Sequence, residues 1–141
     1  MTKTTAMKWM AKYVKLRDAR DQGYVYGRYV KCCTCGCVLT MGTKNCQAGH
    51  FIGRGLGGGS GVYFDERNVH AQCYQCNRFR QGAPHEYELF LIEKYGQKVV
   101  DELRFLDKNQ SYKGKIDAIG LMYKQMYQEL KGELWTRCKK R

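Results

Sequence analysis

The chain has 141 residues and a formal net charge of +12, a length that suits one compact domain with its own core. No run approaches the roughly 20 apolar residues that span a bilayer, and the N-terminus lacks the apolar region of a signal peptide. We therefore expect an intracellular protein with no membrane partner, in which the eight cysteines stay reduced and metal binding is more plausible than disulfides.

Basic side chains gather at the two ends of the chain. Residues 1–31 hold eight basic and two acidic side chains, residues 131–141 hold five basic and one acidic, and the middle is nearly balanced. Lys and Arg attract polyanions, and nucleic acid gains affinity as they displace counterions from phosphates. We expect a nucleic-acid partner; the alternative is a charge that only keeps the protein soluble.

The first expected element is an amphipathic helix over residues 5–21, where apolar residues recur at helical spacing. Gly23 is expected to end it, and the aromatic and β-branched residues 24–30 predict an extended segment. The glycine-rich run 53–61 predicts an irregular loop.

After Pro84 the pattern becomes helical again. Helices are expected over residues 85–95 and 97–107, separated by Gly96, and over 113–136. The last of these carries an apolar stripe at three-four spacing that we interpret as core packing. Its members are Ile116, Ile119, Tyr123, Met126, Leu130 and Leu134.

Two Cys-x-x-Cys pairs predict a structural zinc site. Cys32 and Cys35 form the first pair, Cys73 and Cys76 form the second, and Gly36 helps the backbone turn at the first. Each pair presents two sulfurs from one tight turn, and two such turns complete a tetrahedral shell. The alternative is a set of buried thiols or a redox pair, the class to which we assign the remaining cysteines. These are Cys33, Cys37, Cys46 and Cys138.

The interval between the pairs contains the string QAGHF, which includes His50, and then FDERNVHAQC, which includes Asn68. Asn77 follows the second pair directly. In this order, interleaved with the cysteines, the three residues resemble the HNH, or ββα-metal, nucleases. The fuller string, with a glycine at 82 and EYELFLIEKYG after it, resembles the phage NinG/Rap recombination-protein family over roughly residues 8–130.

The resemblance implies an α+β fold, in which a zinc-stabilised ββα-metal finger over residues 32–82 is embedded between N-terminal (1–31) and C-terminal (83–141) helices of a single domain. It also implies that His50 is the general base that activates water, that Asn68 braces the loop between two strands and orients His50, and that Asn77 binds a catalytic Mg²⁺ or Mn²⁺. Imidazole titrates near neutral pH, and an amide oxygen is a suitable ligand for Mg²⁺.

The chain departs from many HNH sites at Gly49, where an aspartate ligand of the metal is usual. Asp65, Glu66 and Gln47 are possible replacements, but His70 is favoured because it follows Asn68 by two and can share a strand face with it. Four arginines near the proposed centre are candidate DNA contacts, or alternatively a solvated positive face. They are Arg54, Arg67, which has acidic neighbours, Arg78 and Arg80.

The resulting hypothesis is a metal-dependent DNA endonuclease that leaves 5′-phosphate and 3′-hydroxyl ends. The resemblance implies branched recombination intermediates, such as Holliday junctions or flaps, as substrates, and the cytoplasm of a bacterial host as its location. A homodimer would supply two sites for one junction, with residues 113–136 as a possible interface. The alternatives are a non-catalytic zinc-containing DNA-binding accessory protein and a nuclease directed at RNA or at nicking.

Overall fold

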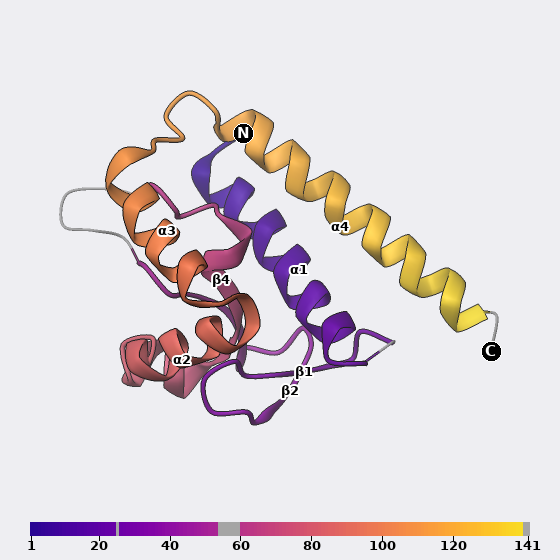
Figure 1. The fold of residues 1–141 in the computed structure, drawn as a ribbon. Helices are drawn as coiled ribbons and strands as arrows, with labels where there is room; N and C mark the ends of the chain where they lie inside the picture. The colour runs from indigo at the N-terminus through magenta and orange to yellow at the C-terminus, as the bar shows by residue number, and fades with distance from the viewer. Residues whose placement is uncertain (25, 54–59, 140–141) are drawn as a thin grey trace.

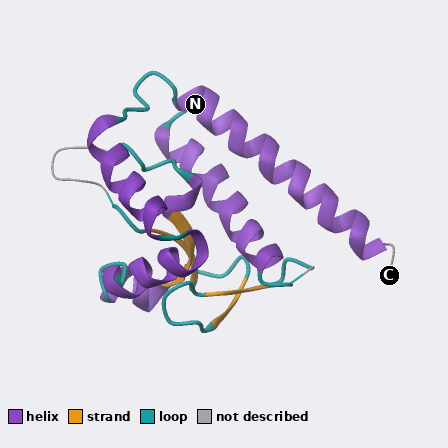
Figure 2. Cartoon of the chain, viewed as in Figure 1, coloured by secondary structure: helices purple, strands orange, loops and turns teal. Residues whose placement is uncertain are grey.

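The computed structural model describes residues 1–24, 26–53 and 60–139, and it combines helices with two small sheets (Figure 1). Figure 2 shows the strands gathered in the part of the molecule away from the C-terminal helix. In chain order the elements are α1 (Lys3–Asp21), β1 (Tyr29–Lys31), β2 (Val38–Thr40), β3 (Cys46–His50), η1 (Glu66–Asn68), β4 (Val69–Cys73), η2 (Gln75–Phe79), α2 (Pro84–Tyr95), α3 (Gln97–Asn109) and α4 (Ile116–Lys139).

The mixed α+β class is confirmed, and each expected helix is present with ends within three residues of the predicted ones. The predicted irregular loop at 53–61 lies mostly outside the described residues, which leave out 54–59. No helix among the described residues combines the length and apolar content that crossing a bilayer requires.

Helices α1 and α4 form the largest part of the core. They begin side by side and diverge toward their C-terminal ends (Figure 1). Met10 and Val14 of α1 and Tyr123 and Leu130 of α4 are buried in this cluster. The apolar stripe predicted for the last helix is therefore core packing. At the end where the helices are closest, a Cβ on Gly120 would lie 1.9 Å from the Met1 sulfur, so a larger residue there would require the flexible Met1 side chain to move.

The two sheets are both antiparallel pairs, β1 with β2 and β3 with β4. The free edge of β4 is covered by α1 through a buried ion pair. Arg17 donates to the carbonyls of Glu66, at 2.6 Å, and Val69, at 2.7 Å. Asp18, paired with Arg17 at 2.9 Å, accepts from the Ala71 N–H at 2.7 Å. These contacts satisfy backbone groups that an edge strand would otherwise leave unpaired, and they hold the strand against the helix.

Helices α2 and α3 pack on each other and against the ribbon formed by the antiparallel pair β3–β4. Tyr87 and Leu91 from α2 and Val100 and Leu103 from α3 are fully buried. Gly96, with φ +96°, lies between the two helices in a left-handed conformation that glycine adopts readily.

Candidate functional site

Four cysteine side chains converge at one point. Cys32 and Cys35 come from the connection between β1 and β2, Cys73 ends β4, and Cys76 lies on η2. Their sulfurs all lie within 4.8 Å of one another, and the Sγ atoms of Cys35 and Cys73 are 3.8 Å apart. Tetrahedral zinc with Zn–S bonds of ~2.3 Å would place its sulfurs ~3.8 Å apart. The predicted ligand set is confirmed as a cluster that fits a metal such as zinc.

Backbone hydrogen bonds shape the first pair. The Cys32 N–H donates to the Cys37 carbonyl at 2.8 Å, and the Gly36 N–H donates to the Cys32 carbonyl at 2.9 Å. Gly36 has a φ of +77°, which explains a glycine directly after the pair. The Cys33 N–H donates to the Ala71 carbonyl on β4 at 2.9 Å. The turn that holds two sulfurs is thereby attached to the strand that ends in the third.

The thiols of the cluster differ in acidity. Burial opposes ionisation of Cys32, but hydrogen bonds from the Thr34 hydroxyl and from backbone groups lower the pKa of this thiol to about 6. Burial raises the pKa of Cys73 to about 11 and that of Cys76 to about 12, and the charge of Cys32 adds to both shifts. A bound divalent cation would supply the charge that allows all four to ionise. Outside the cluster lie Cys33, Cys37, Cys46 and Cys138.

His50 is the last residue of β3, and its ring stacks on Tyr63 with centroids 4.4 Å apart and planes at 19°. Its Nε2 lies 3.0 Å from the Tyr63 carbonyl oxygen. Because a carbonyl only accepts, Nε2 carries the proton in this contact, and Nδ1 is the basic nitrogen of the neutral ring. The Lys3 ammonium lies 4.4 Å from the centre of the Tyr63 ring. The stacking and the hydrogen bond together fix the ring orientation and its tautomer.

Asn68, fully buried, precedes β4 and joins two parts of the connection between β3 and β4. Its Oδ1 accepts from the Ile52 N–H at 2.8 Å, and its Nδ2 donates to the carbonyls of Ile52, at 2.9 Å, and Val62, at 3.1 Å. Its own carbonyl accepts from the Phe51 N–H at 2.9 Å. Asn68 therefore holds the two residues that follow His50.

Amide side chains gather on the ribbon face opposite His50. Residues alternate between faces along a strand, and Gln47 and Gln72 are directly paired across the ribbon on that opposite face. Asn77, on the wide helical turn η2, donates through Nδ2 to Gln47 Oε1 at 2.8 Å. Gln72 is fully buried, and its Oε1 has no hydrogen-bond partner among the described residues. This face thus presents several amide oxygens, one of them unsatisfied.

The structure explains why residue 49 is a glycine. A Cβ on Gly49 would lie 1.9 Å from Oε1 of Gln72, so any side chain there would displace that amide. The Gln72 amide is fixed by Nε2, which donates to Thr34 Oγ1 at 3.1 Å and to the Gly82 carbonyl at 2.9 Å. Gln72 is not among the residues that the motif singles out. Strand alternation, which places it on the face of Gly49, is the signal that points to it.

His70 is fully buried on the face opposite His50, against α2. Its Nε2 lies 3.1 Å from the Tyr95 hydroxyl, and its Nδ1 lies 3.4 Å from the Tyr87 hydroxyl. Burial, with the charges of Arg17 and Lys94, holds the pKa of His70 well below its usual value. Metal binding by His70 would require one of the tyrosine contacts to be given up.

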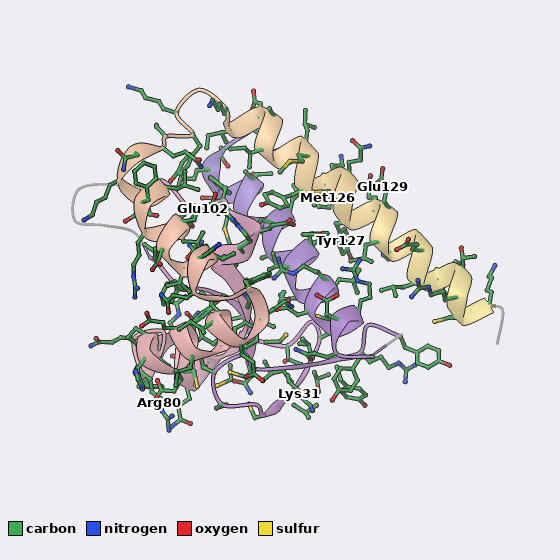
Figure 3. All side chains as sticks on the ribbon, in the orientation of Figure 1. Lys31, Arg80, Glu102, Met126, Tyr127 and Glu129 are labelled. Carbon is green, nitrogen blue, oxygen red and sulfur yellow. The ribbon has the colours of Figure 1, made fainter. Side chains whose placement is uncertain are left out.

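The four arginines proposed as DNA contacts have different surroundings. Arg67 donates to Asp65 at 3.0 and 2.8 Å and to Glu102 at 2.8 Å, so its charge is already paired. Arg78, on η2, and Arg80, just after it, are exposed. Figure 3 shows Arg80 at the outer edge of the molecule. Arg54 lies outside the described residues.

Comparison with known proteins identifies one family. The family described as "Bacteriophage Lambda NinG protein" matches residues 2–133. "Protein ninG" of Salmonella phage P22 is 32% identical over 105 residues, which cover 74% of this chain and 49% of that protein. "Protein ninG" of Escherichia phage 933W is 37% identical over 76 residues, and that of Escherichia phage lambda is 36% identical over 76 residues. Each of these two alignments covers 54% of this chain and 35% of the relative. The chain thus spans half or less of the length of these relatives. No solved structure matches it.

Proposed function

The chain belongs to the bacteriophage lambda NinG family, and on that premise we propose that it is a divalent-metal-dependent endonuclease acting on branched DNA. The support comes from the unit formed by β3, β4 and η2. The cysteine cluster joins one end of this unit to the turn between β1 and β2. The net charge of +12 favours a polyanionic substrate.

The observation that carries the proposal is the setting of His50. The ring is half-buried, stacked on Tyr63 and hydrogen-bonded through Nε2 to a carbonyl oxygen, which makes Nδ1 the basic nitrogen of the neutral ring. In the proposed reaction Nδ1 takes a proton from the water that attacks the phosphodiester. Asn68 holds the backbone after His50 and so preserves this orientation. The expected products are a 5′-phosphate and a 3′-hydroxyl.

We place the catalytic metal at Asn77, beside the amide face; because this face is opposite His50, the phosphate must contact both from the end of the ribbon where β3 ends. The donor set fits Mg²⁺ or Mn²⁺, because amide oxygens are hard ligands and Oε1 of Gln72 is buried without a hydrogen-bond partner among the described residues. Asn77 and Gln47, whose amide groups are 2.8 Å apart, would supply the remaining protein ligands of the ion. When bound, the ion would stabilise charge on the phosphate and on the leaving oxygen. We prefer these residues to His70, whose ring nitrogens both contact tyrosine hydroxyls.

Arg78 and Arg80 are exposed on and just after η2, and we propose that they contact DNA phosphates. Cutting a four-way junction symmetrically needs two nuclease sites, so we also propose that two copies act on one junction. The stripe on α4 that was a candidate interface packs on α1 within one chain, so such a dimer would use other surfaces.

A cleavage panel tests the function. Purified protein is incubated with a four-way junction, a flap, a nicked duplex, a linear duplex and RNA, with Mg²⁺ or Mn²⁺ or without added metal. We expect metal-dependent cutting of the junction or flap, its loss in His50→Ala, and its retention in His85→Ala, which changes an exposed histidine at the start of α2. Absence of cutting on every substrate, or full activity of His50→Ala, would refute the proposal. DNA binding without cutting would favour the accessory-protein alternative.

A further inference from the structure

A second site is formed where α1 and α4 diverge. A groove of about 710 Å³ lies there, bounded by the two helices and by the turns at Tyr26–Gly27 and Met41–Gly42. Its volume is within the range of ~300–1,000 Å³ typical of ligand sites. The His50 region contributes none of its described lining residues. The groove therefore needs an explanation separate from the proposed catalytic unit.

The groove combines cations with aromatic rings. Lys12, Lys15 and Lys131 line it, and none of its described lining residues is acidic. The Lys12 and Lys131 ammoniums each lie 5.9 Å from the centre of the Tyr127 ring, on which they converge. Figure 3 shows Tyr127 on the side of α4 that faces α1. A ligand that fits this groove should therefore carry negative charge and flat apolar surfaces.

Two further aromatic side chains stand at the rim. Tyr26 is 61% exposed and Trp135 is 63% exposed, and both line the same groove, so their ring faces are open to a ligand there. Gly132, on the groove side of α4, leaves open space, because a Cβ added there meets nothing within 4 Å among the described residues. Rings that are exposed beside an open groove are suited to stacking against planar groups.

We propose that this groove binds an unpaired DNA strand, whose bases stack on the rim aromatics while its phosphates lie against the lysines. Sites for single-stranded nucleic acid combine these two features, and stacking accepts any base sequence. A duplex keeps its base faces covered, so the aromatic rings would give it no comparable contact. The choice of DNA rests on the proposed function, and the groove would supply that nuclease with contact to an unpaired arm of branched DNA.

The test is a fluorescence-anisotropy titration of the whole chain carrying His50→Ala, without added Mg²⁺ or Mn²⁺ so that DNA is not cut. The probes are a fluorescein-labelled 12-nucleotide oligo(dT), a 12-base-pair duplex and the matching oligo(U). We expect Trp135→Ala to weaken oligo(dT) binding about tenfold, as the loss of one stacked base predicts. The matched control Phe105→Ala removes a ring that is also 63% exposed, outside the groove, and should change affinity less than twofold.

Two more variants separate groove occupancy from a general loss of structure. Gly132→Leu fills the open space and should weaken oligo(dT) binding without lowering the thermal midpoint, since leucine favours helix over glycine. The double variant Lys12→Gln/Lys131→Gln should reduce the slope of log affinity against log salt by about 1.4. Affinity within twofold of the parent in both Trp135→Ala and Gly132→Leu, tenfold tighter binding of oligo(U), or no binding of oligo(dT) would overturn the proposal. Because no cutting is measured, such a result leaves the nuclease proposal standing, and a failed cleavage panel does not decide this titration.

Discussion

Replacing Asn68 with alanine removes three hydrogen bonds from one fully buried side chain. The backbone of Ile52 is only half-buried and can partly bond to water, so its two lost bonds should cost about 0.5–1.5 kcal/mol each. The carbonyl of Val62 lies at a fully buried residue, and leaving it unpaired should cost about 1–3 kcal/mol. Summed, these losses should lower the unfolding free energy by about 4 kcal/mol, which corresponds to about 13 °C in thermal midpoint.

Urea unfolding followed by circular dichroism measures this loss, with zinc held constant. Asn109→Ala is a matched control, because Asn109 makes one exposed bond, to the Phe105 carbonyl at 2.8 Å. It should change the unfolding free energy by less than about 0.5 kcal/mol. A difference between the two variants below about 1 kcal/mol would refute the view that Asn68 fixes the segment after His50.

Three further predictions concern the interior and the cysteine cluster. His70 takes up a proton near pH 6.5 in the unfolded chain but not in the folded chain, so the unfolding free energy should decrease below that pH, by about 1.4 kcal/mol between pH 7.5 and 5.5. Urea titrations at several pH values measure this decrease, and the same dependence of unfolding free energy on pH in His70→Gln and the parent would contradict it. Metal analysis should return about one zinc per chain, lost in Cys73→Ser and kept in Cys37→Ser, whereas equal zinc content in both variants would exclude the proposed ligands. Gly49→Ala should destabilise the fold by about 1–3 kcal/mol, since its Cβ meets the Gln72 amide, and unchanged thermal unfolding would show that this amide is free to move.

Patterns local to the chain predicted most of the framework. The helices were found from apolar periodicity because a helix that packs on one side carries its burial pattern in consecutive turns. The stripe containing Tyr123 and Leu130 packs on α1 as expected. The cysteine cluster was predicted equally well, since each Cys-x-x-Cys turn brings its sulfurs close together regardless of the rest of the fold.

Features that depend on distant contacts were not predictable in this way. Strand β2, Val38–Thr40, is too short to carry a recognisable alternation. Helical spacing does not show that the charged pair Arg17 and Asp18 is buried against β4. The unsatisfied oxygen of Gln72 and the tyrosine contacts of His70 depend on how the ribbon packs, which the motif alone does not specify.

Single-turnover cleavage of a branched DNA substrate, with binding measured in parallel, tests the central claim most directly. The account predicts that His50→Ala lowers the Mg²⁺- or Mn²⁺-dependent cutting rate by at least about 100-fold, within the range that general acid–base groups contribute. Affinity for the uncut substrate should stay within about twofold of the parent, because in the proposed reaction His50 acts on the proton of the attacking water. Cutting by His50→Ala at the parent rate, or loss of cutting only in proportion to lost binding, would contradict the account.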